Sequence, residues 1–222
     1  MTDRPRIEIE AHGAYLVAGV SVVRRAAQVE TDHGEPIDWS VGPAIEAPDP
    51  CRLCRCGLSR AKPFCDDECA AAGFDGTETA DRAPSASRQR VLVGDGVVMT
   101  DDQSLCTDAG FCGDRSSNVW NMIRGTPDPS VRDRLMRMVS LCPSGRLAYS
   151  LGKEAEPVEP PYEASIYMQD DGPLWVRGRI PVAAADGEVY EIRNRVTLCR
   201  CGRSDNKPLC DGSHKRTGFR DS

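Results

Sequence analysis

Four side chains that can bind a metal lie within sixteen residues near the C-terminus. They follow the order Cys199-x-Cys201, eight residues, and then Cys210 and His214 separated by three residues. Thiolate and imidazole groups are ligands of zinc and of iron-sulfur clusters, so this spacing predicts a site for one or the other. Spacing alone does not choose between the two.

The same frame occurs a second time near the N-terminus. Its candidate ligands are Cys54, Cys56, Cys65 and Cys69, so cysteine replaces histidine at the fourth position. Cys51 lies three residues before this frame and outside it. The chain therefore carries one ligand loop in two copies. Residues between and beyond the ligands match as well: Gly57 with Gly202, Ser59 with Ser204, Lys62-Pro63 with Lys207-Pro208, and Gly73-Phe74 with Gly218-Phe219.

The middle of the chain holds a third set of cysteines, Cys106, Cys112 and Cys142. Cys142 precedes Pro143, and a Cys-Pro pair is a common place for the last, sequence-distant ligand of an iron-sulfur cluster. Asp108 lies between the first two cysteines. A carboxylate there can bind iron or accept hydrogen bonds from nearby backbone amides, and the sequence leaves both roles open.

Composition limits where such ligands can work. Hydrophobic residues make up 40% and aromatic residues 5% of the 222 residues, so small domains of this chain need support from a metal. No apolar run could span a membrane and the N-terminus lacks the apolar centre of a signal peptide, so we expect a cytoplasmic protein. Reducing conditions there keep the 11 cysteines free. The net charge of -6 argues against a nucleic-acid partner.

Short strands are expected to position the two loops. Residues 7–22 resemble residues 165–182, and each of these segments lies upstream of its loop. The N-terminal copy has 14 more residues between Gly19 and Cys54 than the C-terminal copy has in the equivalent stretch. Alternating and apolar runs predict strands at residues 7–10, 15–17 and 174–176, with turns at His12-Gly13 and Asp171-Gly172.

The central segment has a different pattern. Residues 91–100 predict a hairpin that turns at Gly94-Asp95-Gly96, and residues 130–141 predict an amphipathic helix. Asp128-Pro129 supplies a cap and a first-turn proline for that helix. Polar or proline-rich stretches at 77–88 and 156–163 are typical of linkers.

The C-terminal loop CRCGRSDNKPLCDGSHKRTGF resembles the CDGSH iron-sulfur family, also called NEET proteins. The resemblance implies a 2Fe-2S cluster bound by Cys199, Cys201, Cys210 and His214. The N-terminal loop resembles the same family but has Cys69 in place of His and Asp67 in place of Gly. It implies a four-cysteine 2Fe-2S site, with zinc as the alternative.

The central segment resembles the divergent ferredoxin-like domain known as a 4Fe-4S mono-cluster domain. Cys106-Thr-Asp-Ala-Gly-Phe-Cys112 and Cys142-Pro-Ser-Gly145 carry this resemblance. Three cysteines imply a 3Fe-4S cluster, or a 4Fe-4S cluster whose fourth iron takes another ligand. Asp108 lies where this family often has histidine, which makes it a candidate for that ligand.

The change from histidine to cysteine has an expected electronic effect. An oxidised 2Fe-2S core with four thiolates carries a formal charge of about -2, and one with three thiolates and a neutral imidazole about -1. The C-terminal centre is therefore expected to accept electrons more readily. Because a proton competes with iron for the imidazole of His214, acid is expected to weaken this site before the N-terminal one.

We expect an α+β fold of small antiparallel β units with cluster-binding loops. Two pseudo-symmetric CDGSH repeats, at residues 1–82 and 156–222, would flank a ferredoxin-like domain at residues 83–155. The two repeats of one chain would pair with each other, giving a monomer that is an intramolecular pseudo-dimer.

The sites predict electron handling and no catalysis, since no nucleophile-base arrangement or nucleotide-binding glycine loop is present. The leading hypothesis is a soluble multicluster electron carrier or redox relay whose partner is a reductase or oxidoreductase. One alternative is a protein for iron-sulfur cluster storage, transfer or sensing. Another is a zinc-stabilised interaction module. The basic residues near the two loops are expected to shield cluster charge or to contact an acidic redox partner. They are Arg52, Arg55 and Arg60 in the first copy and Arg200, Arg203 and Lys207 in the second.

Overall fold

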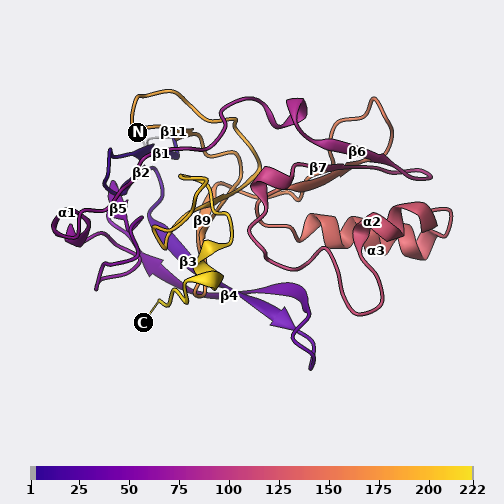
Figure 1. The fold of residues 1–222 in the computed structure, drawn as a ribbon, viewed down its shortest axis with the longest axis horizontal. Coiled ribbons are helices and arrows are strands. Elements are labelled where there is room, and N and C mark those ends of the chain that lie inside the picture. Colours follow the sequence, from indigo (N-terminus) through magenta and orange to yellow (C-terminus); the bar gives the residue numbers. More distant parts are fainter. Residues whose placement is uncertain (1–3, 222) are drawn as a thin grey trace.

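The computed structural model describes residues 4–221, which form mainly small β-sheets with a few short helices (Figure 1). This agrees with the expected small β units. The strands are β1 (Arg6–Ile9), β2 (Tyr15–Ala18), β3 (Val22–Glu30), β4 (Pro36–Glu46), β5 (Cys51–Leu53), β6 (Arg90–Val93), β7 (Val98–Asp101), β8 (Leu147–Ser150), β9 (Ser165–Gln169), β10 (Leu174–Arg177), β11 (Val182–Ala183) and β12 (Arg195–Leu198). The helices are α1 (Glu68–Ala71), α2 (Val119–Met122), α3 (Pro129–Ser140) and α4 (Ser213–Arg216), with 3-10 turns η1 (Ser85–Ser87), η2 (Gln103–Leu105) and η3 (Ile123–Gly125).

The predicted hairpins of the two repeats are confirmed. β1 and β2 pair antiparallel around His12-Gly13, and β9 and β10 pair antiparallel around Asp171-Gly172. His12 and Asp171 both adopt positive φ angles, 50° and 51°, in equivalent turns. The repeated hairpin thus folds in the same way in both halves.

Each of these hairpins is completed by a strand from the other half of the chain. The first sheet has the order β11-β1-β2-β5, and the second has the order β12-β10-β9-β3-β4. β11 runs parallel to β1, and β3 runs parallel to β9. The expected antiparallel units therefore have two parallel exceptions, because each repeat passes its third strand across to the other repeat's sheet.

The 14 additional residues of the N-terminal copy contribute to a long hairpin formed by β3 and β4. This hairpin extends beneath the central unit in Figure 1. The ring of Trp39 on β4 lies 4.9 Å from that of Phe111 and 5.0 Å from that of Trp175. Its Nε1 donates to the carbonyl of Leu141 at 3.0 Å, so the hairpin ties the central unit to the rest of the fold.

The central unit consists of the sheet β6-β7-β8 with α2 and α3 packed beside it (Figure 1). The predicted helix is confirmed at α3, where the Asp128 side chain accepts a hydrogen bond from the amide of Ser130. Its apolar face buries Leu135 and Val139 completely. The unit thus has a small core of its own.

The two repeats share one core. Ile7 and Val17 from the first half and Ile166 and Val176 from the second half belong to the same buried cluster. Among the described residues, no helix is long and apolar enough to cross a membrane.

Candidate metal centres

The C-terminal ligand residues come together as two pairs. The sulfurs of Cys199 and Cys201 lie 3.8 Å apart, and the sulfur of Cys210 lies 3.4 Å from Nδ1 of His214. Two sulfurs bound at about 2.3 Å to one tetrahedral metal would be about 3.8 Å apart, and a sulfur and a nitrogen would be about 3.5 Å apart. Each pair therefore has the spacing of two ligands on one metal ion.

Strand β12 and helix α4 position these ligands. β12 ends one residue before Cys199, and the amide of Cys199 donates to the carbonyl of Pro208 at 2.8 Å. Gly212, at φ 84°, turns the chain into α4, whose first turn presents His214 toward Cys210. A short strand and a one-turn helix are thus enough to bring the ligands together.

The surroundings act differently on the individual ligands. The hydrogen bond with Cys199 raises the pKa of Cys201, and burial raises that of Cys210, so these two thiols lose their protons on metal binding. A hydrogen bond from Cys201 lowers the pKa of Cys199 to about 6, so a thiolate forms readily there. The amide of Gly212 points at the sulfur of Cys210 at 3.4 Å. Burial lowers the pKa of His214 to about 4, which keeps its ring neutral and able to bind metal at neutral pH.

The N-terminal loop repeats this geometry. The sulfurs of Cys54 and Cys56 lie 3.7 Å apart, and a hydrogen bond from Cys56 lowers the pKa of Cys54 to about 6. The sulfurs of Cys65 and Cys69 and a carboxylate oxygen of Asp67 all lie within 4.8 Å of one another. Among residues 4–221 no other three such groups meet this closely, so the four cysteines form two pairs and do not surround a single ion.

The central ligand residues line one cavity of about 240 Å³. Cys106, Cys112 and Cys142 lie around it together with Asp108 and Arg146. The sulfur of Cys106 lies 3.5 Å from Oδ1 of Asp108. Donors spread around a roomy cavity fit a cluster larger than a single ion.

The central and C-terminal ligand loops touch each other. Gly212 leaves room for the side chain of Asp108, since a β-carbon on Gly212 would lie only 2.9 Å from Cγ of Asp108. Nζ of Lys215 donates to the carbonyl of Asp108 at 2.6 Å. A continuous series of contacts thus runs from the sulfur of Cys106 through Asp108 and Gly212 to the sulfur of Cys210.

The two loops of the repeats also touch. A β-carbon on Gly57 would lie 2.9 Å from the carbonyl oxygen of Cys201, and one on Gly202 would lie 2.5 Å from that of Cys56. Tyr15 from the first half is fully buried and donates from its hydroxyl to the carbonyl of Cys199 at 2.8 Å. The C-terminal loop therefore contacts both other ligand sets.

Comparison with known families agrees with this arrangement. The family described as "Iron-binding zinc finger CDGSH type" matches residues 12–68 and 171–215, and "Divergent 4Fe-4S mono-cluster" matches residues 92–152. The chain belongs to the CDGSH iron-sulfur family. It is a double-CDGSH protein with a central 4Fe-4S mono-cluster domain between its two CDGSH regions. No curated protein and no solved structure matches it.

The donor sets of this double-CDGSH protein fit the clusters that its domains bind. CDGSH domains bind 2Fe-2S clusters, and the central domain type binds a 4Fe-4S cluster. Two ligand pairs per CDGSH loop match two irons, while one zinc ion would need its four donors close together. All 11 cysteines are free thiols, so no disulfide competes for the sulfurs.

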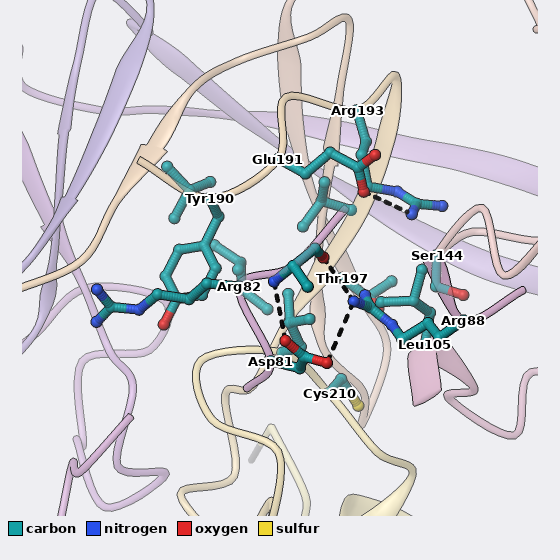
Figure 2. Close-up of a pocket in the computed structure, with 15 residues that line it drawn as sticks. Asp81, Arg82, Arg88, Leu105, Ser144, Tyr190, Glu191, Arg193, Thr197 and Cys210 are labelled. Carbon is teal, nitrogen blue, oxygen red and sulfur yellow. Dashed lines mark hydrogen bonds and ion pairs between the residues drawn. The ribbon is translucent and has the colours of Figure 1, made fainter. Parts of the chain in front are cut away.

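A small pocket lies beside Cys210 in the double-CDGSH protein. Figure 2 shows it between the Asp81–Arg88 ion pair and the Glu191–Arg193 ion pair, with Cys210 on its lower edge. Its volume of about 30 Å³ has room for only a water molecule or two. This packing covers the inner side of the C-terminal loop.

Some residues have places that differ from the sequence-based expectation. Arg55 and Arg200 are each only 1% exposed, so a role in contacting an acidic partner is wrong for both. Their position between two loop cysteines gave no sign of burial. Cys51 is buried on β5, and burial raises its pKa to about 11, as suits a thiol outside the ligand set.

Arg195 is a further residue of the site that the sequence pattern did not indicate. Its side chain donates to the carbonyls of Val139 and Cys142 at 3.0 and 2.8 Å, and to the carboxylate of Glu159 at 2.7 Å. It thereby joins β12, which leads into the C-terminal loop, to the end of α3, which leads into Cys142. An arginine within a short apolar strand was the only sequence signal.

Proposed function

We propose that this double-CDGSH protein is an electron carrier or redox relay, and not an enzyme. It would work in the cytoplasm, where its thiols stay reduced, with a reductase or oxidoreductase as its partner. When bound, the iron-sulfur clusters supply one-electron oxidation and reduction. The polypeptide holds the ligands, excludes water and sets the electrostatic surroundings.

The proposed ligands follow from the pairs described above. Three sets are assigned: a four-cysteine 2Fe-2S site at Cys54, Cys56, Cys65 and Cys69; a three-cysteine, one-histidine 2Fe-2S site at Cys199, Cys201, Cys210 and His214; and a 4Fe-4S or 3Fe-4S site at Cys106, Cys112 and Cys142, with Asp108 as the candidate fourth ligand. The sulfur-carboxylate distance of 3.5 Å at Cys106 and Asp108 supports the last of these roles.

The contact of the three ligand loops within one chain is the observation that carries this proposal. Asp108 and Gly212 link the central loop to the C-terminal loop, and Gly57 and Gly202 pack against the facing cysteine carbonyls. A storage protein has no need for such contacts, whereas a relay needs short separations between its centres. The C-terminal loop would then be the middle member of the series.

The equivalent sheet orders support an intramolecular pseudo-dimer. β11-β1-β2-β5 and β3-β9-β10-β12 correspond strand by strand, and in each sheet the first strand comes from the other repeat. The packing of Gly57 on Cys201 and of Gly202 on Cys56 is likewise reciprocal. We therefore propose a monomer, and a stable dimer in light scattering would contradict this.

Cluster transfer is the second candidate function, and one observation favours it. Cys65 is only half-buried and is flanked by exposed Asp66 and Asp67, whereas Cys210 and His214 are buried. Cluster release at neutral pH would therefore begin at the N-terminal site. Electron transfer and cluster transfer can be separated by their rates.

The test begins with anaerobically purified protein assayed for iron, sulfide and zinc. We expect iron and sulfide at all three sites, bleaching by dithionite, and full recovery of the colour with a one-electron oxidant. Transfer of clusters to an apo-ferredoxin should be slower than this cycle. Zinc in place of iron, or cluster transfer faster than reoxidation, would contradict the carrier function.

The contact between the central and C-terminal loops can be tested by replacing Gly212 with alanine. The added β-carbon would push against Asp108 and separate the loops, so magnetic interaction between the two reduced centres should weaken in EPR spectra. Gly218→Ala is the matched control, because Gly218 also has a positive φ, 64°, but has no atom within 4 Å of its β-carbon position. Equal spectra for the two variants would argue against a linked pair of centres.

A further inference from the structure

The arginine between the first two cysteines of each CDGSH loop is buried beneath the ligands. Arg55 and Arg200 are each 1% exposed. The guanidinium of Arg55 lies 5.8 Å from the ring centre of Phe74, and that of Arg200 lies 5.2 Å from the ring centre of Phe219. Each of these phenylalanines follows the fourth ligand by five residues, so the two arginines occupy equivalent places.

Their partners differ at one position. Arg200 forms an ion pair with Asp221, and Nη2 lies 3.0 Å from the carboxylate Oδ2. Arg55 has only carbonyl partners, Gly76 at 2.5 Å and Glu10 at 3.3 Å, and its buried Nε has no partner. It makes no ion pair within residues 4–221.

The position responsible is identifiable in the repeat. Gly76 and Asp221 each stand two residues after the stacked phenylalanine. Asp221 is held in place by reciprocal hydrogen bonds with Asp171, at 2.8 and 2.9 Å. One half of the chain therefore has a carboxylate where the other half has glycine, and only the half with histidine ligation has the carboxylate.

The net charge of each cluster with its ligands, its buried arginine and any paired carboxylate is then the same in the two repeats. Four thiolates on an oxidised 2Fe-2S core give about -2, and adding Arg55 gives about -1. Three thiolates and an imidazole give about -1, and Arg200 and Asp221 cancel. Solvent ions screen these groups only weakly because they are buried.

We propose that the positive charge of Arg55 offsets the negative charge of the additional thiolate at the four-cysteine centre. At the C-terminal centre, Asp221 neutralises Arg200, so no such positive charge acts on that cluster. The side chains of Arg55 and Asp221 set electron affinity through charge and make no hydrogen bond to a ligand side chain among the described residues. The two CDGSH centres are thereby matched in charge, so their potentials differ less than their ligands alone would make them differ. This proposal rests on the ligand sets assigned above, but it does not require any partner or relay function.

The test is an EPR-monitored redox titration of the whole protein with its clusters. Asp221→Asn leaves Arg200 unneutralised and should raise the C-terminal midpoint potential by about 60 mV or more, a tenfold change in the one-electron equilibrium. Asp38→Asn is the control, because Asp38 is an exposed carboxylate paired with exposed Arg137 and shares no ion-pair partner with Asp221. A shift with Asp221→Asn no larger than that of the control would overturn the proposal.

Two further variants keep the result decisive. Arg55→Met should lower only the N-terminal potential. His214→Cys gives the C-terminal centre four thiolates beside a neutralised arginine, so its potential should fall below that of the N-terminal centre. If it falls only to the N-terminal value, the ligands alone set the potentials and the proposal is wrong. These outcomes do not depend on electron exchange with any partner, so failure of the carrier function would leave them unchanged.

Discussion

Arg195→Met is expected to destabilise the folded protein by about 2–4 kcal/mol, because it leaves buried carbonyl oxygens without their hydrogen-bond donor. Its guanidinium is completely buried and carries the hydrogen bonds that join β12 to the end of α3. Methionine would leave the carbonyls of Val139 and Cys142 without their donor and Glu159 without its cation. Denaturant unfolding of the protein with its clusters measures the loss.

Arg132→Met is the control for this variant. Arg132 is a half-buried residue of α3 and makes one long hydrogen bond, 3.4 Å, to the carbonyl of Asp95. Its replacement should change the free energy of unfolding by about 0.5 kcal/mol or less. Since Arg195 also positions Cys142, its loss should reduce the iron content of the central site first. An equal change in the free energy of unfolding for the two variants would show that Arg195 is not the link between β12 and the central unit.

His214→Cys is expected to remove most of the acid sensitivity of the C-terminal site. Burial lowers the pKa of His214 to about 4, compared with 6.5 for the free side chain. The neutral ring is therefore favoured in the folded state, and its contribution is present above about pH 6.5 and lost as the pH falls toward 4. A bound metal ion also favours the neutral ring of His214 over the protonated ring, because only the neutral ring binds metal.

The rate of colour loss between pH 7.5 and 5, followed with EPR to identify the centre, measures this effect. In the natural protein, loss of the C-terminal centre should accelerate about tenfold per pH unit below about pH 6.5, as one proton is taken up. His214→Cys should flatten this dependence. Cys69→His is the reciprocal variant, and it should make the N-terminal centre acid-sensitive. If neither exchange alters the profile, solvent exposure and not the imidazole controls cluster loss.

The close approach of the candidate ligand residues and the local hairpins were predictable because their signals are local. Cys199 to His214 define one loop within a few residues, and Asp128-Pro129 marks the start of α3 regardless of the rest of the chain. The turn at Asp171-Gly172 is likewise set by two adjacent residues. Such features depend on contacts that the sequence places side by side.

The exchange of strands between the repeats was not predictable from the same signals. β11 has two residues and pairs with β1, which lies more than 170 residues earlier in the chain. Parallel pairing of this kind requires no turn sequence, so no local pattern records it. The burial of Arg55 and Arg200 was missed for a related reason, because the carbonyls that satisfy them come from residues outside the loops or beyond the ligands.

The exchanged strands affect how this chain can be made. The first sheet lacks its edge strand until Val182 and Ala183 have left the ribosome, so synthesis must pass Ala183 before the N-terminal half can close. The hydroxyl of Tyr15 likewise has its acceptor, the carbonyl of Cys199, only after that residue has been synthesised. Iron delivered to Cys54, Cys56, Cys65 and Cys69 during translation would reach them before the first sheet is complete. Maturation of the N-terminal centre is therefore expected to follow the synthesis of β11 and of Cys199.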